Sequence, residues 1–204
     1  MVSKMKAVDL IRLNMEIESV INLDGDLEPL PEKESAIFSI SRHRDGYVTY
    51  FRQDVPSAIR ERLRALDVDR LLDDHEMVKR ILSEHTPCKN VFAGRSCYLT
   101  HTPSPDEFPD AVLHEGCYVI MVDGKPVSWA WTQDGNEQAA ELAVETLPEF
   151  RRRGYGRQVV AAWAANVIGS GKVAFYSYII GNVASEALAR SLEVVQYAIM
   201  TTYS

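Results

Sequence analysis

Hydrophobic residues gather in three consecutive short segments in the second half of the chain, a pattern typical of strands. These segments are 117–122, 127–133 and 139–147, and turn residues separate them at Asp123-Gly124 and Asp134-Gly135. Short turns between such segments join neighbouring antiparallel strands. We therefore expect a three-stranded antiparallel meander.

Beyond Pro148 the hydrophobic spacing changes from the period of a strand to that of a helix. Val159, Trp163 and Val167 recur at helical spacing and predict a helix over 154–168 with one buried stripe. The elements predicted after it, in chain order, are a strand over 172–180, a helix over 182–192 and a strand over 194–203. The second half thus predicts a mixed sheet with helices packed on it.

The first half of the chain is less regular, but helical and strand patterns also follow one another there. Helices are predicted over 4–20, 56–66 and 74–82, and strands over 36–40, 47–51 and 95–100. The segment 102–110 contains three prolines and predicts a linker. The chain is therefore divided into an N-terminal α/β region, residues 1–105, and a C-terminal domain, residues 106–204.

The composition is that of a folded globular protein. Of the 204 residues, 46% are hydrophobic and 25% are charged. No apolar run has the length of a membrane helix or the character of a secretory signal, so we expect a cytoplasmic protein without a membrane partner. The three cysteines form no CxxC pair, which predicts reduced thiols and no metal site. A formal charge of −7 argues against nucleic-acid binding.

One segment of this acidic chain is basic. Residues 150–185 contain no Asp or Glu but contain five cations, Arg151, Arg152, Arg153, Arg157 and Lys172. The arginines surround Gly154 and Gly156 at the predicted start of a helix, where backbone N–H groups and the helix dipole attract anions. Glycines let the backbone approach phosphate oxygens closely, so the turn predicts a diphosphate cradle. A solvated, arginine-rich helix start is the alternative.

Two better-known phosphate motifs do not match this turn. A Rossmann fingerprint needs a third glycine where this chain has Val159, and it lies in an early parallel βαβ unit. A P-loop needs a GK[ST] sequence after the glycines, which is absent.

The segment from Pro148 to Gly156 (PEFRRRGYG) resembles the R/Q-x-x-G-x-G/A acyl-CoA motif of the GNAT-superfamily N-acetyltransferases. The strand at 141–146 has the corresponding position, and Asn182-Val183-Ala184-Ser185 is similar to the family's N-x-x-[AS] segment. The resemblance covers about residues 117–203. It implies an α/β (α+β) fold, a GNAT-like mixed central sheet flanked by helices, here with a mixed α/β N-terminal extension.

The resemblance also implies acetyl-CoA (CoA) as the cofactor, with the pantetheine arm filling a gap in the sheet as a pseudo-strand. The residues that it implies for this role are Ala143, Val144 and Thr146 for the pantetheine amides, Arg151, Arg152, Arg153, Gly154, Tyr155, Gly156 and Arg157 for the pyrophosphate, and Asn182 and Ser185 beside the pantetheine. Asn182 can also cap the following helix, and both roles can hold together.

Acyl transfer to an amine requires a base, because an amine of pKa about 10.4 is protonated at pH 7, a penalty of roughly 4–5 kcal/mol. Alternation along the strand puts Glu141, Ala143 and Glu145 on one face. The resemblance implies a base near Glu141, with Glu145 as its neighbour, and His114 is a third candidate. Each of them can instead be a solvated or structural residue.

The acid that protonates the leaving thiolate is less clear. Members of the family often carry a tyrosine seven residues after the asparagine, where this chain has Ala189. Tyr197 is the substitute that we select; Tyr176 and Tyr178 are alternatives, although strand tyrosines often serve packing.

Two further features stand apart from the acid and base candidates. Glu193-Val194 stands where the family commonly has Gly-Phe, which puts the local helix end in doubt. Trp129 and Trp131 share a strand face and either wall an acceptor pocket or, as we favour, pack in the core.

The sequence therefore predicts an N-acetyltransferase that moves an acetyl or short acyl group from acetyl-CoA to a primary amine by direct attack in a ternary complex. We expect a small-molecule amine acceptor rather than a protein, an acceptor cleft built in part by the N-terminal half, and consider a homodimer. The alternatives are a non-catalytic CoA-binding sensor or subunit, favoured by Ala189, and a different polyphosphate ligand at the arginine turn.

Overall fold

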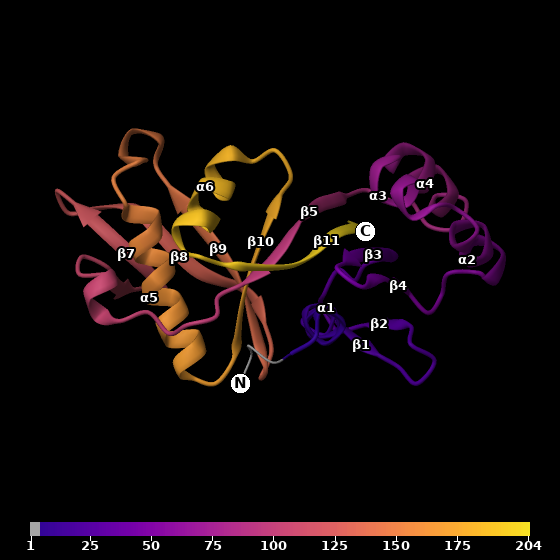
Figure 1. Cartoon of the computed structure of the whole chain (residues 1–204), viewed down its shortest axis with the longest axis horizontal. Helices are drawn as coiled ribbons and strands as arrows, with labels where there is room; N and C mark the ends of the chain where they lie inside the picture. The colour runs from indigo at the N-terminus through magenta and orange to yellow at the C-terminus, as the bar shows by residue number, and fades with distance from the viewer. Residues whose placement is uncertain (1–4) are drawn as a thin grey trace. The chain divides into compact units, whose positions relative to one another are not determined.

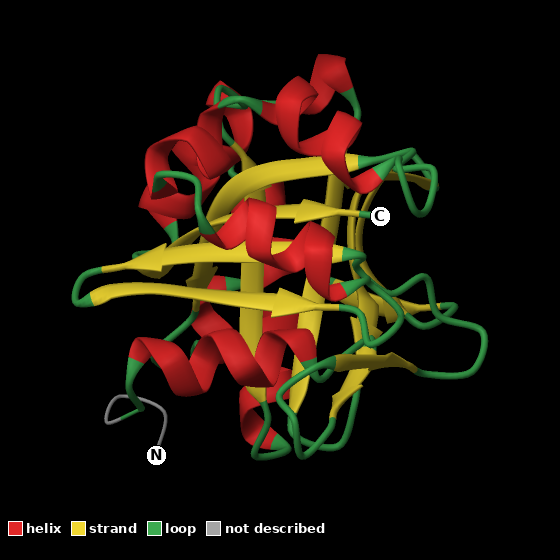
Figure 2. Cartoon of the chain, turned by 90° about the vertical axis from the view of Figure 1, so that its right-hand side faces the viewer, coloured by secondary structure: helices red, strands yellow, loops and turns green. Residues whose placement is uncertain are grey.

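The computed structural model describes residues 5–204 and divides into two compact units (Figure 1). Of the described residues, unit 1 consists of Met5 and Cys97 to Gln196, and unit 2 consists of Lys6 to Ser96 with Tyr197 to Ser204. The predicted boundary between residues 105 and 106 falls inside unit 1. Both units mix helices and strands (Figure 2), which confirms the α/β (α+β) class.

The strands of unit 1 form the predicted meander and add one edge strand to it. The order is β10-β9-β8-β7-β6, and the bounds are β6 (Val112–His114), β7 (Cys117–Val122), β8 (Lys125–Gly135), β9 (Ala139–Thr146) and β10 (Val173–Ile179). Strands β6 to β9 pair antiparallel, whereas β10 pairs parallel to β9. Asp123 and Gly124 turn β7 into β8 with φ of 50° and 75°, the two positive values that a type I′ hairpin turn needs.

Helices α5 (Tyr155–Gly169) and α6 (Val183–Ser191) pack on one face of this sheet and enclose its core. Trp163 of α5 is 2% exposed, and its indole N–H donates to Thr132 Oγ1 on β8 at 2.9 Å. Ile120, Leu142 and Ala174, from three different strands, belong to the same buried cluster. The predicted apolar stripe of α5 is therefore confirmed as the surface that holds the helix to the sheet.

The end of α6 has Glu193 at the position where the resemblance led us to expect a glycine. Glu193 takes the left-handed conformation itself, with φ of 52°. The Val194 N–H then donates to the Ala189 carbonyl at 3.3 Å, which satisfies one of the last carbonyls of the helix. The helix thus stops at Ser191, close to the predicted end.

In unit 2, four strands lie side by side in the order β4-β3-β11-β5, and two more form a separate small sheet. The bounds of the four are β3 (Phe38–His43), β4 (Gly46–Phe51), β5 (Val91–Tyr98) and β11 (Val195–Tyr203). The smaller sheet pairs β1 (Ser19–Ile21) with β2 (Leu27–Pro29). The helices are α1 (Ala7–Met15), α2 (Ser57–Arg64), α3 (Val68–Asp73) and α4 (His75–Leu82). The C-terminal strand therefore lies inside the sheet of the N-terminal half, between β3 and β5.

The first predicted helix is too long at its C-terminal end. It was expected over 4–20, but α1 ends at Met15 and Ser19–Ile21 form β1; Lys4 lies outside the described residues. The β-branched Val20 and Ile21 favour extended backbone, and β2 supplies hydrogen-bond partners for it.

The short elements that were not predicted include α3 and η2. The carboxylate of Asp67 caps α3 by accepting the Asp69 N–H, and Leu71 and Leu72 of that helix are buried. The 3₁₀ turn η2 (Pro105–Glu107) lies within the predicted linker. Both elements are about two turns long or shorter, so hydrophobic periodicity gives little signal for them.

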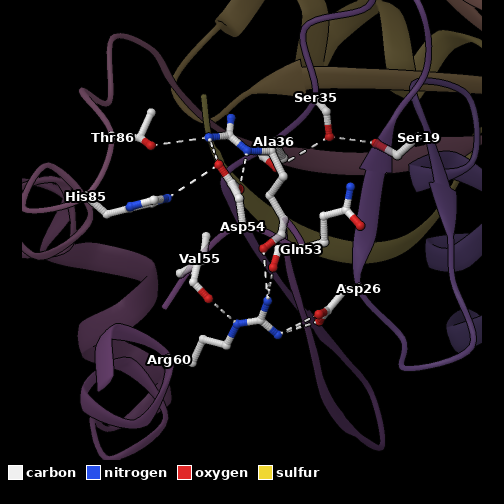
Figure 3. A network of polar contacts seen from close by, with 11 residues as sticks. Ser19, Asp26, Ser35, Ala36, Gln53, Asp54, Val55, Arg60, His85 and Thr86 are labelled. Carbon is white, nitrogen blue, oxygen red and sulfur yellow. Dashed lines mark hydrogen bonds and ion pairs between the residues drawn. The ribbon is translucent and has the colours of Figure 1, made fainter. Parts of the chain in front are cut away.

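Arg60 is the centre of a polar network in unit 2 (Figure 3). Its guanidinium binds both carboxylate oxygens of Asp26, at 2.6 and 2.8 Å. It also donates to the backbone carbonyls of Arg52, Gln53 and Val55, at 3.0, 3.1 and 2.7 Å. The side chains of Arg60 and Asp26 are only 15% and 18% exposed. One side chain thus ties α2 to the end of β4 and to the loop before β2.

No helix between residues 5 and 204 combines the length and the apolar character that crossing a bilayer requires.

We expect Arg60→Met to lower the free energy of unfolding by about 2–3 kcal/mol, because the largely buried Asp26 carboxylate loses its partner. Arg62→Met, on the same helix, is the matched control: it removes an ion pair with Glu84 whose side chains are 51% and 50% exposed, and should change stability far less. Urea unfolding followed by circular dichroism measures both variants. Equal effects of the two substitutions would contradict the structural role of Arg60.

Candidate functional site

Strands β9 and β10 separate after a short paired stretch. Their register runs from Val173 opposite Ala139 to Phe175 opposite Glu141. Both strands continue beyond this point, yet no later register pair joins them in the part of the chain that the structure describes. The sheet of unit 1 therefore opens along the second half of β9.

Hydrogen bonds at the two ends of β9 show which main-chain groups face this opening. The Val173 N–H of β10 donates to the Gln138 carbonyl at 2.9 Å, and the Leu147 N–H donates to Val127 of the β8 segment at 2.9 Å. Since backbone groups of successive residues alternate between the two sides of a strand, even-numbered residues of β9 face β10. The main-chain groups of Val144 and Thr146 thus face the opening, whereas those of Ala143 face β8, opposite Trp131.

A cavity of about 960 Å³ adjoins the opening, bounded by the end of β9, the arginine turn and the starts of α5 and α6. It brings together most of the predicted site residues. Those that line it are Val144, Glu145, Thr146, Arg151, Arg152, Gly154, Tyr155, Gly156, Arg157, Asn182 and Ser185. Glu141, Ala143, Arg153 and Tyr197 are not among its lining residues in the described chain.

Sequence reasoning missed the α6 wall of the cavity. That wall is formed by Ala184, Ala187, Leu188 and Ser191. Their spacing of three, four and seven residues is that of one helical face, so the pattern could have identified them once the helix was assigned. Pro148, Phe150 and Val183 complete the lining.

The start of α5 is suited to an anion. Gly154 is its N-cap with φ of 81°, a left-handed value that favours glycine. Among the described residues, no side chain caps this end and no acidic residue lies in the first turn. The N-terminal N–H groups of a helix have no partner within it, and the helix dipole adds partial positive charge. This end of the helix therefore offers donors and positive potential to the cavity.

Arg151 and Arg153 are held by backbone oxygens and by an aromatic ring rather than by carboxylates. Arg151 donates to the Thr146 carbonyl at 3.1 Å, and Arg153 donates to the Glu149 carbonyl at 3.1 Å with its guanidinium 5.1 Å from the Phe150 ring centre. Within residues 5–204, Arg151, Arg152 and Arg153 form no ion pair with a carboxylate. The cavity thus has a cationic wall.

Arg157 has a different environment from the other arginines. Its guanidinium forms an ion pair with Glu107 at 2.9 Å and donates to the Ser191 carbonyl at 3.1 Å. These contacts join η2 and the end of α6 to the first turn of α5. Arg157 therefore stabilises the positions of η2 and α6 around the cavity and also lines it.

Gly156 allows α5 to approach β9 closely. A Cβ atom at this position would lie 3.3 Å from Thr146 Oγ1 and 3.8 Å from Leu188 Cδ2. The Thr146 hydroxyl is itself fixed by a 2.8 Å hydrogen bond to the Ser128 hydroxyl. The two glycines of the motif thus have separate roles, since Gly154 shapes the turn and Gly156 sets the packing of the helix on the strand.

Asn182 lies at the N-terminus of α6, where its side-chain oxygen accepts the Ser185 N–H at 3.1 Å. The capping role predicted for it is therefore confirmed. Both residues also line the cavity, so Asn182 caps the helix and at the same time lies where a ligand could contact it.

The two glutamates of β9 share a strand face but differ in their environment. Leu142 and Val144 pack towards α5, which leaves Glu141 and Glu145 on the opposite face, as predicted. Glu145 is exposed and lines the cavity. The Glu141 carboxylate accepts the Ser177 N–H of β10 at 2.8 Å. Only Glu145 is thus presented to a ligand.

The candidate tyrosines are buried or committed to other contacts. Tyr176 is 3% exposed and donates to the Ser185 carbonyl at 3.1 Å, and burial raises its pKa to about 12. Tyr178 is partly buried against the core, with its ring centre 5.8 Å from that of Tyr176. Tyr197 belongs to unit 2 and is 7% exposed.

The remaining candidates lie at the edge or on the open face of the sheet. His114 is on β6, three strands from β9, a separation of about 14 Å at the usual strand spacing. Trp129 and Trp131 are only partly buried, not enclosed in the core as we favoured. Their register partners on β9 are Glu145 and Ala143, so they share the face of the glutamates.

Comparison with known proteins supports the motif assignment. Residues 124–199 match the FR47-like protein family, which is GNAT-related. This segment includes the whole of β8, β9, α5, β10 and α6, and the first part of β11. No curated protein matches the chain.

Several solved structures are similar at low identity. A structure from Novosphingobium aromaticivorans assigned to the GNAT family of acetyltransferases is 20% identical, with a TM-score of 0.49, and the match covers 57% of this chain and 65% of that one. A GCN5-related N-acetyltransferase-like protein from Streptococcus suis is 10% identical, with a TM-score of 0.49. The match covers 86% of this chain and 87% of that one. A GNAT-family acetyltransferase from Colwellia psychrerythraea is 9% identical, with a TM-score of 0.47. The match covers 98% of this chain and 97% of that one. At these values the likenesses assign no function.

We expect Gly156→Leu to reduce binding of inorganic pyrophosphate at least tenfold, because the new side chain forces α5 away from Thr146 and disturbs the helix start. Gly169→Leu, at the other end of the same helix, meets nothing within 4 Å and should bind pyrophosphate like the wild type. Isothermal titration calorimetry measures both. Wild-type affinity in Gly156→Leu would contradict a binding role for the arginine turn.

Proposed function

We propose that this protein is a GNAT-superfamily N-acetyltransferase that moves an acetyl group from acetyl-CoA to a primary amine. The FR47-like match over residues 124–199 supports this proposal. The observation that carries this proposal is the opening between β9 and β10, which lies beside a cationic, uncapped helix start. An extended amide chain that ends in a pyrophosphate fits these two features together.

The residues present fit such a cofactor. The main-chain groups of Val144 and Thr146 can bond the pantetheine amides as a neighbouring strand would. The N–H groups at the start of α5, with Arg151 and Arg152, can hold the pyrophosphate. The cavity volume lies within the roughly 300–1,000 Å³ usual for cofactor sites.

Glu145 is the residue that we assign to proton removal. Acetyl-CoA supplies an activated thioester, whose acyl carbon forms the new bond to the amine nitrogen while the carbon–sulfur bond breaks. The amine must first lose a proton. Glu145 is exposed and is one of the residues that line the cavity, so its carboxylate can accept the proton directly or through water. A main-chain N–H that faces the opening, at Val144 or Thr146, can polarise the thioester oxygen.

The leaving thiolate does not require a dedicated acid residue. The position of the family's usual tyrosine is Ala189, which is 3% exposed, and the Tyr176 hydroxyl is committed to a backbone carbonyl. A thiol of pKa about 8.5 costs only about 2 kcal/mol to leave as a thiolate at pH 7, so water can supply the proton. We propose that catalysis here depends on positioning and backbone polarisation.

We propose a small-molecule amine as the acceptor, bound on the β9 face that carries Glu145. Trp129 is the register partner of Glu145, and Trp131 is that of Ala143. Both rings are partly exposed and can contact the body of a cationic substrate. A second function, a CoA-binding sensor without transfer activity, is favoured by Ala189 alone.

We expect acetyl-CoA to bind with a micromolar Kd and to stabilise the protein by about 2.7 kcal/mol at a ligand concentration of 100 Kd. Calorimetry and thermal unfolding measure this, with ATP and NAD as competitors that share the diphosphate but lack pantetheine. Binding of ATP as tight as that of acetyl-CoA would show that the opening between the strands contributes nothing.

We expect Glu145→Gln to lower kcat at least tenfold, because the amide cannot accept the ammonium proton, while the Kd for acetyl-CoA stays unchanged. Thiol release with a panel of amines measures the rate. Glu149→Gln, an exposed glutamate just beyond the strand, is the control. Thiol release that no amine stimulates, together with tight acetyl-CoA binding, would support the sensor instead.

A further inference from the structure

We propose that Glu141 is a positioning residue whose carboxylate takes the place of a backbone acceptor and so holds β9 and β10 apart. The inference rests on the proposed function, because the opening that it maintains is the one assigned to pantetheine. Glu141 therefore has a different role from Glu145, although both residues lie on the same strand face.

The hydrogen bonds of the paired stretch fix where the next bonds of the ladder would fall. The Val173 N–H donates to the Gln138 carbonyl. In a parallel ladder the next bonds advance two residues on each strand, so a continued ladder would pair the Ser177 N–H with the Leu142 carbonyl. The Ser177 N–H instead donates to the Glu141 carboxylate at 2.8 Å. A side-chain oxygen thus replaces the backbone oxygen at the first rung that is missing.

The position of Glu141 in the sheet supports this role. Its register partner on β10 is Phe175, which is fully buried, and this is the last pair that joins the two strands. On the other side, the register of β8 and β9 shifts between Thr132 and Asp134, and Asp134 is the partner of Glu141. A bulge increases local twist. Both neighbours of β9 therefore change their pairing at the level of Glu141.

The consequence for ligand binding is preorganisation. Without an alternative acceptor, the Ser177 N–H would be best satisfied by Leu142, and the next rung would pair the Val144 N–H with the Ser177 carbonyl. The ligand would then have to break a formed ladder, and its apparent affinity would fall by the fraction of molecules that are open. Because the Glu141 carboxylate accepts the Ser177 N–H, the main-chain N–H and carbonyl of Val144 stay available for a ligand.

The experiment compares Glu141→Gln, which keeps a side-chain oxygen acceptor, with Glu141→Ala, which removes it. Glu137→Gln, an exposed residue in the preceding turn, is the control. Two quantities are measured: the Kd for acetyl-CoA by calorimetry, and the hydrogen exchange of the Val144 amide in the free protein by NMR. The second does not depend on any ligand.

We expect Glu141→Ala to weaken acetyl-CoA binding at least tenfold and to slow exchange of the Val144 amide at least tenfold, because the ladder closes. Glu141→Gln should stay within threefold of the wild type in both quantities, and this rescue also shows that the position tolerates substitution. The proposal is overturned if Glu141→Ala matches the wild type in Val144 exchange, or if Glu141→Gln is as defective as Glu141→Ala.

The two proposals fail in different ways. If the wild type does not bind acetyl-CoA, the proposed function fails, and Val144 exchange in Glu141→Ala still decides whether Glu141 holds the strands apart. If the wild type binds and Glu141→Gln keeps its affinity but loses turnover, Glu141 takes part in the chemistry, and its assignment as a positioning residue is overturned.

Discussion

The hydrogen-bonding demand of the strand backbone is the constraint on which the site of unit 1 depends. Every N–H and carbonyl of β9 needs a partner, and β8 supplies those on one side. On the other side β10 supplies partners only as far as Phe175. The separation of the two strands is stable because Glu141 satisfies the first N–H that would otherwise close the ladder, and the groups beyond it are left for a ligand.

The rest of the site follows from one continuous stretch of chain. After β9 ends at Thr146, the arginine turn reverses the chain direction, and Gly156 lets α5 begin in contact with that strand end. The parallel return of the chain as β10 then brings α6, capped by Asn182, to the opposite wall. A β-α-β-α segment thus forms the strand opening and the uncapped start of α5 side by side, because a parallel crossover brings both to the same edge of the sheet.

Local sequence signals predicted the elements of this segment well, since the meander, the helix stripe and the arginine turn each depend on neighbouring residues. The missing features depend on distant ones. Glu141 meets Ser177 across 36 positions, and no periodicity reveals that bond. Trp129 and Trp131 alternate like core residues, but burial depends on what covers a face. α1 was predicted too long because the pairing of Val20 with β2 is a tertiary contact.

The position of β11 has a consequence for how the protein is made. This strand follows all the elements of unit 1 in the sequence, yet within unit 2 it lies between β3 and β5, with Tyr203 paired to Phe38. Strands β3 and β5 therefore have no central neighbour until the arginine turn, α5 and α6 have been synthesised. Unit 2 is thus begun before unit 1 but completed after it.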